Sequence, residues 1–265
     1  MSTLTYAVAD STTMLRRQLR HMQRYLSVTV FLVGMPIVFL LLFVYVFGGT
    51  LGAGLGGPSG GRAEYLEYVL PGILLMGVAA GAIGTAISVS TDMTEGIVAR
   101  FRTMAIFRPS VLTGHVLGSM LQTMLSLAVV TAVAMLIGFR TDATLVEWTG
   151  IVGVLAAISF ALTWLCVAFG MVAKTVEAAS NLPQPLVFLP FLGSGFVPTD
   201  SMPAALRWFA EYQPFTPIMD TVRGLLLGTA IGSSAGIAVA WCVGIALVGY
   251  LWAKKLYNRD PDPVR

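Results

Sequence analysis

Six long apolar stretches occupy most of this chain, and none of them has a lysine, arginine, aspartate or glutamate in its middle. A helix that crosses a bilayer needs about 20 apolar residues, because each residue advances it by only about 1.5 Å. The sequence therefore predicts an all-α, polytopic membrane protein with a single transmembrane domain over residues 1–265. The six expected transmembrane helices cover residues 27–47, 68–89, 111–139, 148–173, 178–197 and 231–253.

Charged residues make up only 11% of the chain, whereas an average soluble domain has about 25%. Ion-coupled pumps and channels need ionisable residues inside their spans. The six stretches hold none in their middles. If the protein moves a substrate, we therefore expect the energy to come from outside this chain.

Basic residues are distributed unequally between the two sides of the membrane. Six spans place both termini on one side, and twelve of the sixteen arginines and lysines fall on that side. Loops rich in arginine and lysine remain in the cytoplasm, so both termini are predicted to be cytoplasmic. The four basic residues on the opposite side are Arg62, Arg140, Arg207 and Arg223.

The sequence lacks the motifs of common catalytic and cofactor sites. It has no G-x-x-x-x-G-K-[ST] loop for nucleotide phosphates, no G-x-S-x-G, and no Cys/His cluster with metal-ligand spacing. Cys166 and Cys242 fall inside predicted spans and are interpreted as small apolar residues. His115, near the end of the third span, is interpreted as hydrogen-bonded or facing lipid headgroups. We therefore expect no enzymatic activity, cofactor or metal in this chain.

The N-terminal residues 11–26 have the pattern of an amphipathic helix. Leu15, Leu19, Met22 and Leu26 follow the spacing of one helical face. Such a helix lies in the headgroup layer, with its basic residues toward anionic lipid. It acts either as a plain membrane anchor or as a contact surface for a partner. Arg17, Arg20 and Arg24 line another face of this helix, and Arg16 is the fourth basic residue of the segment.

The cytoplasmic connection between the second and third spans predicts a short helix over residues 92–105. Asp92 and Glu95 have the spacing of a capping box, with Asp92 as the N-cap, and Pro109 ends the excursion. The segment either docks into a groove on a soluble partner or only turns the chain. The residues that would carry docking are Asp92, Glu95, Ile97, Arg100, Phe101, Arg102 and Arg108.

The two long outer connections differ in composition. Residues 48–61 are rich in glycine and are predicted to be flexible. Residues 198–228 are half apolar and interrupted by prolines, which predicts two short helices at 202–212 and 216–227. These helices either re-enter the outer leaflet, buried in protein, or lie flat on the outer surface. The key residues of this segment are Pro203, Trp208, Pro214, Asp220 and Arg223, with Asp220 and Arg223 spaced to pair across one turn.

Neutral polar residues inside the spans are candidates for a transport pathway. Asn181 and Gln184 lie among the prolines of the fifth stretch, and Gln122 lies in the third. Polar groups of this kind also hold transmembrane helices together. Both roles stay open for these three residues. Gly77 and Gly81 in the second span would allow close helix contact.

Several stretches resemble ABC-2 type permeases, and the resemblance covers nearly the whole chain. Residues 95–102 (EGIVARFR), continuing to Arg108-Pro109 and Gly114, resemble the coupling segment of that family. Residues 196–198 (FVP), 214–217 (PFTP) and Arg223-Gly224 resemble its outer re-entrant region. Residues 40–48 (LLLFVYVFG) resemble the daunorubicin-resistance branch. One departure is Gln213, where many relatives have asparagine, and it affects a local turn or helix cap.

The resemblance implies an assembly as well as a fold. Family members work as pairs of permeases, and each permease docks a separate ATPase subunit that binds ATP and Mg. The daunorubicin branch exports amphipathic drugs or lipids from bacteria. This chain is thus expected to be a permease subunit in a bacterial plasma membrane, as a homodimer with two ATPase subunits in contact with membrane lipid, without a nucleic-acid partner. The alternatives are an exporter of lipid-linked glycan and a membrane scaffold or immunity protein that transports nothing.

Overall fold

The structure is a computed structural model that describes residues 26–56, 61–97 and 109–258. These residues form helices and connections and contain no β-strand. Five helices within them are long and apolar enough to cross a membrane. The elements are α2 (Leu26–Leu42), η1 (Phe43–Phe47), α3 (Gly48–Gly56), α4 (Arg62–Thr94), α6 (Pro109–Leu136), α7 (Leu145–Val172), α8 (Val176–Asn181), α9 (Pro185–Phe188), η3 (Leu189–Leu192), η4 (Thr199–Ser201), α10 (Ala204–Tyr212), α11 (Phe215–Leu227) and α12 (Ser234–Tyr257).

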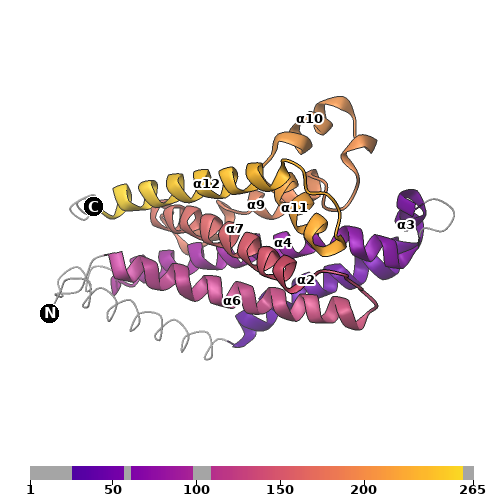
Figure 1. The fold of residues 1–265 in the computed structure, drawn as a ribbon. Coiled ribbons are helices and arrows are strands. Elements are labelled where there is room, and N and C mark those ends of the chain that lie inside the picture. The colour runs from indigo at the N-terminus through magenta and orange to yellow at the C-terminus, as the bar shows by residue number, and fades with distance from the viewer. Residues whose placement is uncertain (1–25, 57–60, 98–108, 259–265) are drawn as a thin grey trace.

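The helix α4 lies in the middle of the bundle and packs against α2, α6, α7 and α11 (Figure 1). Glycines allow its neighbours to approach closely. A Cβ atom on Gly170 of α7 would lie 2.5 Å from the carbonyl oxygen of Ala86 in α4. A Cβ atom on Gly249 of α12 would lie 2.6 Å from the backbone nitrogen of Leu165 in α7. The prediction of close contact at Gly81 is confirmed, because a Cβ there would meet the hydroxyl of Thr123 in α6.

The glycine-rich stretch after the first span is helical, so the prediction of a flexible connection is wrong as far as Gly56. The helix α2 continues through the π-helical turn η1 into α3. The α3 helix packs on the start of α4, where a Cβ on Gly52 would lie 2.0 Å from the Gly61 oxygen. Glycine is needed there for this close approach, which gives the stretch a packing partner.

The fifth predicted span is three short pieces, α8, α9 and η3, rather than one continuous helix. Pro183 and Pro185 separate α8 from α9, because proline lacks the N–H that a helix interior needs. This broken segment starts at the end of the bundle where α7 finishes and Gly170 contacts Ala86. It ends near the opposite end, where Gly195 contacts Gly72 of α4.

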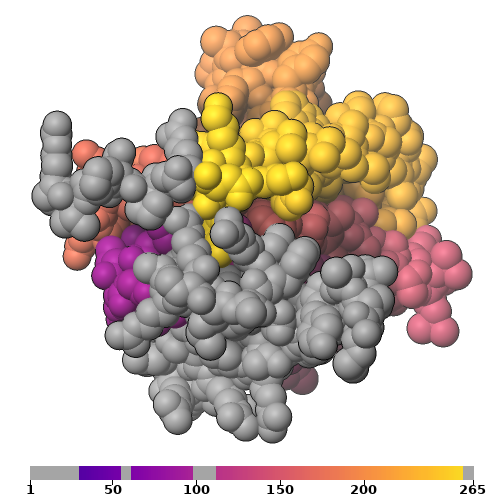
Figure 2. Space-filling model, turned by 90° about the vertical axis from the view of Figure 1, so that its left-hand side faces the viewer, coloured from indigo at the N-terminus to yellow at the C-terminus, as the bar shows by residue number. Residues whose placement is uncertain are grey.

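The two helices predicted in the outer segment are confirmed to within two residues as α10 and α11. Most of α11 is buried, and it packs against α4, α7 and α12. The neighbouring α10 stands out from the bundle, as the orange atoms of Figure 2 show. Trp208 on α10 is 66% exposed. The helix α11 is therefore mostly buried and α10 mostly exposed, although the sequence predicted both simply as short helices.

Candidate functional site

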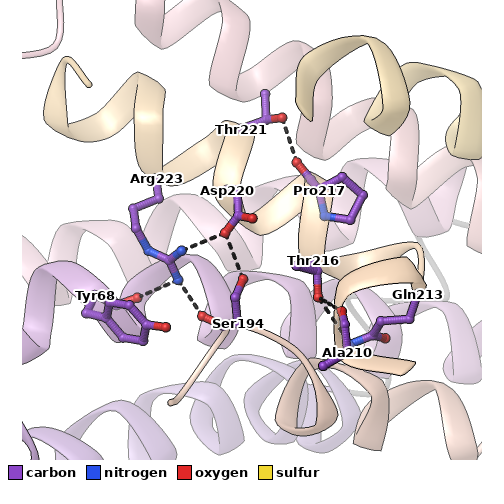
Figure 3. Close-up of polar contacts among 9 residues, drawn as sticks. All are labelled: Tyr68, Ser194, Ala210, Gln213, Thr216, Pro217, Asp220, Thr221 and Arg223. Carbon is purple, nitrogen blue, oxygen red and sulfur yellow. Dashed lines mark hydrogen bonds and ion pairs between the residues drawn. The ribbon is translucent and has the colours of Figure 1, made fainter. Parts of the chain in front are cut away.

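Arg223 on α11 is the centre of a polar cluster that joins α11 to the first half of α4 (Figure 3). Its Nη1 donates to the Asp220 carboxylate at 2.8 Å. Its Nη2 donates to the backbone oxygens of Ser194, at 2.6 Å, and Tyr68, at 3.3 Å. The guanidinium also lies over the Tyr68 ring, 4.2 Å from its centre. The predicted pairing of Asp220 with Arg223 is confirmed.

The turn at Gly193–Ser194–Gly195 contributes the Ser194 hydroxyl and the Ser194 backbone oxygen to this cluster. The Ser194 hydroxyl donates to Asp220 at 2.7 Å. The two glycines let the turn lie directly against α4 and α11, since a Cβ on Gly195 would be 2.7 Å from the Met219 sulfur. Asp220 therefore accepts from both α11 and the turn, and Arg223 links both of them to α4.

Gln213 extends the same cluster toward η3. It ends α10, and its side-chain amide donates to the Leu189 oxygen at 2.9 Å. The Thr216 hydroxyl on α11 donates to the Ala210 oxygen of α10 (Figure 3). The sequence assigned Gln213 only a local turn or cap, and its contact with Leu189 is a tertiary contact that spacing could not reveal.

The charged residues of α10 are more exposed than this cluster. Arg207 contacts Glu211 at 2.7 Å and Asp200 at 2.6 Å. The hydrogen bond to Glu211 and the charge of Asp200 raise the pKa of Arg207 further above its already high value. Pro203 precedes α10 and is exposed, whereas Pro214 precedes α11 and is half-buried.

The C-terminal end of α4 holds a buried ion-pair geometry that the sequence did not predict. The Asp92 carboxylate accepts from His115 Nε2 on α6 at 3.0 Å, and both residues are buried. The Ser88 hydroxyl lies 3.3 Å from the other ring nitrogen of His115. The expectation that His115 is hydrogen-bonded is confirmed.

Asp92 does not cap a following helix, so that part of the capping-box prediction is wrong. The helix α4 continues through Asp92 to Thr94, because the buried face of α4 extends that far. Glu95 is the C-cap of α4, and its N–H donates to the Thr91 oxygen at 2.9 Å. Gly96 follows with φ of +70°, which turns the chain out of the helix.

Part of the predicted docking segment can be placed, and Ile97 there is half-buried. The rest of that segment and the N-terminal amphipathic helix lie outside the described residues. The residues concerned are Arg100, Phe101, Arg102 and Arg108 in the first, and Arg16, Arg17, Arg20 and Arg24 in the second.

The predicted pathway residues lie on different elements. Asn181 ends α8 and Gln184 precedes α9, and both are exposed at the break in the fifth segment. Gln122 is half-buried on α6. Their role in a pathway stays a prediction.

An apolar groove of about 390 Å³ lies between α4, α6, α7 and α11. Of the twelve described residues that line it, Thr131 alone carries a hydroxyl group. Leu74 and Trp148 lie in the first halves of α4 and α7, and Leu226 lies on α11. The groove therefore lies toward the end of the bundle where α4 and α7 begin. Apolar ligands suit such a lining.

A model of the family described as ABC-2 type transporter matches residues 11–227 of this sequence. The chain belongs to the ABC-2 type transporter family. The match covers all of the described helices except α12 and includes both the outer polar cluster and the Asp92–His115 pair.

The sequence is similar to three bacterial transport permeases over most of its length. It is 29% identical to the daunorubicin resistance ABC transporter permease protein DrrB1 of Streptomyces coeruleorubidus, over 95% of this chain and 87% of the relative. It is 25% identical to the probable doxorubicin resistance ABC transporter permease protein DrrC of Mycobacterium tuberculosis, over 81% of this chain and 75% of the relative. It is 23% identical to the inner membrane transport permease YadH of Escherichia coli, over 86% of this chain and 90% of the relative.

The charged side chains of this ABC-2 permease gather at the two ends of its five candidate spans. Asp92 lies at one end of α4 and Glu64 in the first turn at the other. In α7 and α12, Glu147 lies in the first turn and Lys254 and Lys255 in the last. The middles of the spans are thus apolar, as the sequence predicted. The permease is a membrane subunit of an ABC exporter.

Proposed function

We propose that this permease exports hydrophobic or amphipathic compounds, such as drugs, antibiotics or lipids, as a homodimer driven by two separate ATPase subunits. The observation that carries the proposal is the apolar groove between α4, α6, α7 and α11, which is lined in part by Leu226 of the helix that also carries Arg223. A hydrophobic compound gains free energy by leaving water for such a lining. ATP and Mg would bind to the ATPase subunits.

The proposed topology has six crossings, with both termini in the cytoplasm. The broken segment of α8, α9 and η3 would be the fifth crossing, because it starts where α7 ends and finishes beside the start of α4. Its interrupted backbone is acceptable at membrane depth where it is buried in protein. In this arrangement α11 dips between the outer ends of α4, α7 and α12. The exposed Trp208 on α10 would lie in the lipid interface.

The names of the relatives support an amphipathic drug as substrate. Two of them are named for resistance to daunorubicin or doxorubicin. The runner-up substrate, a lipid-linked glycan, would favour a wider pathway with aromatic residues. The groove is lined by aliphatic residues with Trp148 as the one aromatic among its described lining residues, which favours the drug or lipid.

Co-purification and vesicle transport test the proposal together. The permease is expressed with candidate ABC ATPase subunits from the same genome, and daunorubicin uptake into inside-out vesicles is measured with ATP. We expect the ATPase to co-purify, and the double variant Glu95→Ala/Arg100→Ala to lose most of the transport. Arg140→Ala, which removes a charge predicted to lie at the outer end, serves as the matched control.

Two results would contradict the proposal. One is a permease that binds no ATPase and moves no drug, as a scaffold or immunity protein would behave. The other is full transport by the Glu95→Ala/Arg100→Ala variant, which would remove the coupling role of residues 95–108.

A further inference from the structure

A polar seam runs between α4 and α6 from the cytoplasmic end of the bundle toward its middle. On α4, the positions Gly81, Thr85, Ser88 and Asp92 are four, three and four residues apart, so they lie on one helical face. On α6, the facing positions His115, Ser119 and Thr123 are four residues apart. The seam is defined by these seven residues.

Hydrogen bonds connect the two sides of the seam at successive levels. Thr85 donates to Ser119 at 2.6 Å, and both hydroxyls are buried. Ser119 also lies 3.3 Å from the Gly81 oxygen of α4. The Asp92 carboxylate and the Ser88 hydroxyl hold the two nitrogens of the His115 ring.

The seam resists any sliding or separation of α4 and α6. Buried polar groups cost free energy when their partners are removed, and a buried carboxylate costs the most. A shift of α6 by one helical turn would move His115 away from Asp92 and Ser119 away from Thr85. Gly81 also fixes the alignment of the two helices, because Thr123 of α6 occupies the space that a Cβ on Gly81 would need.

The Asp92–His115 pair lies where the predicted coupling segment joins the bundle. Asp92 lies two residues before the last residue of α4, and His115 lies six residues after the first residue of α6. One buried pair therefore joins α4, which precedes the predicted coupling segment, to α6, which follows it. An apolar cluster that includes Val89, Val116 and Trp164 packs around this end of the bundle.

We infer that Asp92 and His115 are positioning residues that fasten the coupling segment to a locked α4–α6 pair, and that this pair moves as one rigid lever during transport. The inference rests on the proposed function, since it names how the push of the ATPase enters the membrane domain. The outer cluster is different, because the Asp220 side chain is 39% exposed and can exchange Ser194 for water. Motion is thus expected at the outer end and not within the seam.

Disulfide cross-links test the lever directly. In a protein with Cys166→Ala and Cys242→Ala, one variant carries Thr85→Cys/Ser119→Cys across the seam. A matched variant carries Ser194→Cys/Asp220→Cys across the outer cluster. The Thr85 and Ser119 oxygens are both bonded to Cβ, where a cysteine sulfur would lie, and are 2.6 Å apart. The Asp220 oxygen lies one bond further from the backbone, 2.7 Å from the Ser194 hydroxyl. Loss of free thiols on oxidation therefore verifies each disulfide before transport is measured. Daunorubicin uptake with ATP is measured after oxidation and again after reduction.

We expect the oxidised seam variant to transport at the rate of its reduced form. The oxidised outer variant should transport at least about tenfold more slowly than its own reduced form, which is the baseline because both lack Asp220, since exit requires that end to open. Loss of transport in the oxidised seam variant, with recovery on reduction, would overturn the lever. If the reduced proteins and the unmodified permease also fail to transport with their ATPase, the proposed function itself has failed.

Single variants test the positioning role with a readout that misfolding does not mimic. Asp92→Ala and His115→Ala should lower the amount of drug transported per ATP hydrolysed at least about fivefold. A displaced coupling segment would let the ATPase hydrolyse ATP without moving the transmembrane helices. The swapped variant Asp92→His/His115→Asp should restore much of that ratio. An unchanged ratio, with transport and hydrolysis falling in proportion, would contradict the role.

Discussion

Arg223 joins three separate parts of the chain through one guanidinium group. Its side chain is only 15% exposed and contacts Asp220 on its own helix, Ser194 in the preceding turn and Tyr68 on α4. The planar fork of arginine donates in several directions at once, which a lysine cannot do. One side chain of α11 therefore connects the Ser194 turn and α4 to its own helix.

Replacing Arg223 tests that dependence. Arg223→Ala should destabilise the folded permease by about 2–3 kcal/mol, because it removes hydrogen bonds to a carboxylate and to two backbone oxygens. Arg223→Lys should recover part of this loss. Thermal unfolding in detergent measures the effect, and vesicle transport should fall with it.

The matched control is Arg207→Ala on α10, whose partners Asp200 and Glu211 are exposed by 80% and 42%. An exposed pair contributes about 0–1 kcal/mol, so its unfolding temperature should barely move. Equal effects of Arg223→Ala and Arg207→Ala would show that burial of the cluster is unimportant, and an Arg223→Ala protein with normal expression and transport would remove its proposed role.

Sequence spacing correctly predicted the Asp220–Arg223 pair but wrongly predicted that Asp92 caps a following helix. Asp220 and Arg223 are three residues apart on one helix, so their pairing could be predicted locally. Ser194 and Tyr68 could not, because they lie 29 and 155 residues away from Arg223. The Asp92 and Glu95 spacing fits a capping box, but burial against α6 keeps Asp92 inside α4, and its partner His115 is 23 residues away.

The helices themselves follow the sequence where apolar length or proline decides their bounds. Proline signals located α10 and α11 to within two residues, and Pro183 and Pro185 mark the break in the fifth segment. The glycine-rich composition of α3 predicted a flexible connection, but the segment is helical. Composition alone does not show that Gly52 packs against Gly61. Close approach between helices is likewise a tertiary property, and it makes some glycines essential and others replaceable.

Two glycines of α12 give a matched test of close helix packing. Gly249→Ala should destabilise the protein by about 1–3 kcal/mol, because its Cβ would lie 2.6 Å from the backbone of α7 and force the helices apart. Gly244→Ala lies on the same helix and has no atom within 4 Å of the added Cβ. It should be neutral or stabilise the helix by up to about 1 kcal/mol.

Thermal unfolding of the two proteins in the same detergent checks this difference. Similar unfolding temperatures would mean that α7 and α12 do not pack as closely as the structure places them.

At the scale of the whole molecule, two groups of polar contacts, an apolar groove and the broken segment α8–α9–η3 lie at different places along the bundle. Polar contacts join α4 to α6 near the C-terminal end of α4 and join α11 to the first half of α4. The apolar groove lies between α4, α6, α7 and α11, nearer the end where α4 begins. Five continuous candidate spans would leave the termini on opposite sides, so the broken segment decides the topology and determines which end the ATPase can reach.

Labelling of single cysteines from outside the cell tests whether that segment crosses the membrane. In a protein with Cys166→Ala and Cys242→Ala, the variants Asp142→Cys, Lys174→Cys and Ser233→Cys place a thiol at three exposed connections. A membrane-impermeant maleimide should label positions 142 and 233 in intact cells but not position 174, because residues 178–197 cross between 174 and 233. Permeabilised cells should label all three. Labelling of 174 and 233 from the same side would show that the segment does not cross, and the proposed cytoplasmic location of both termini would then fail as well.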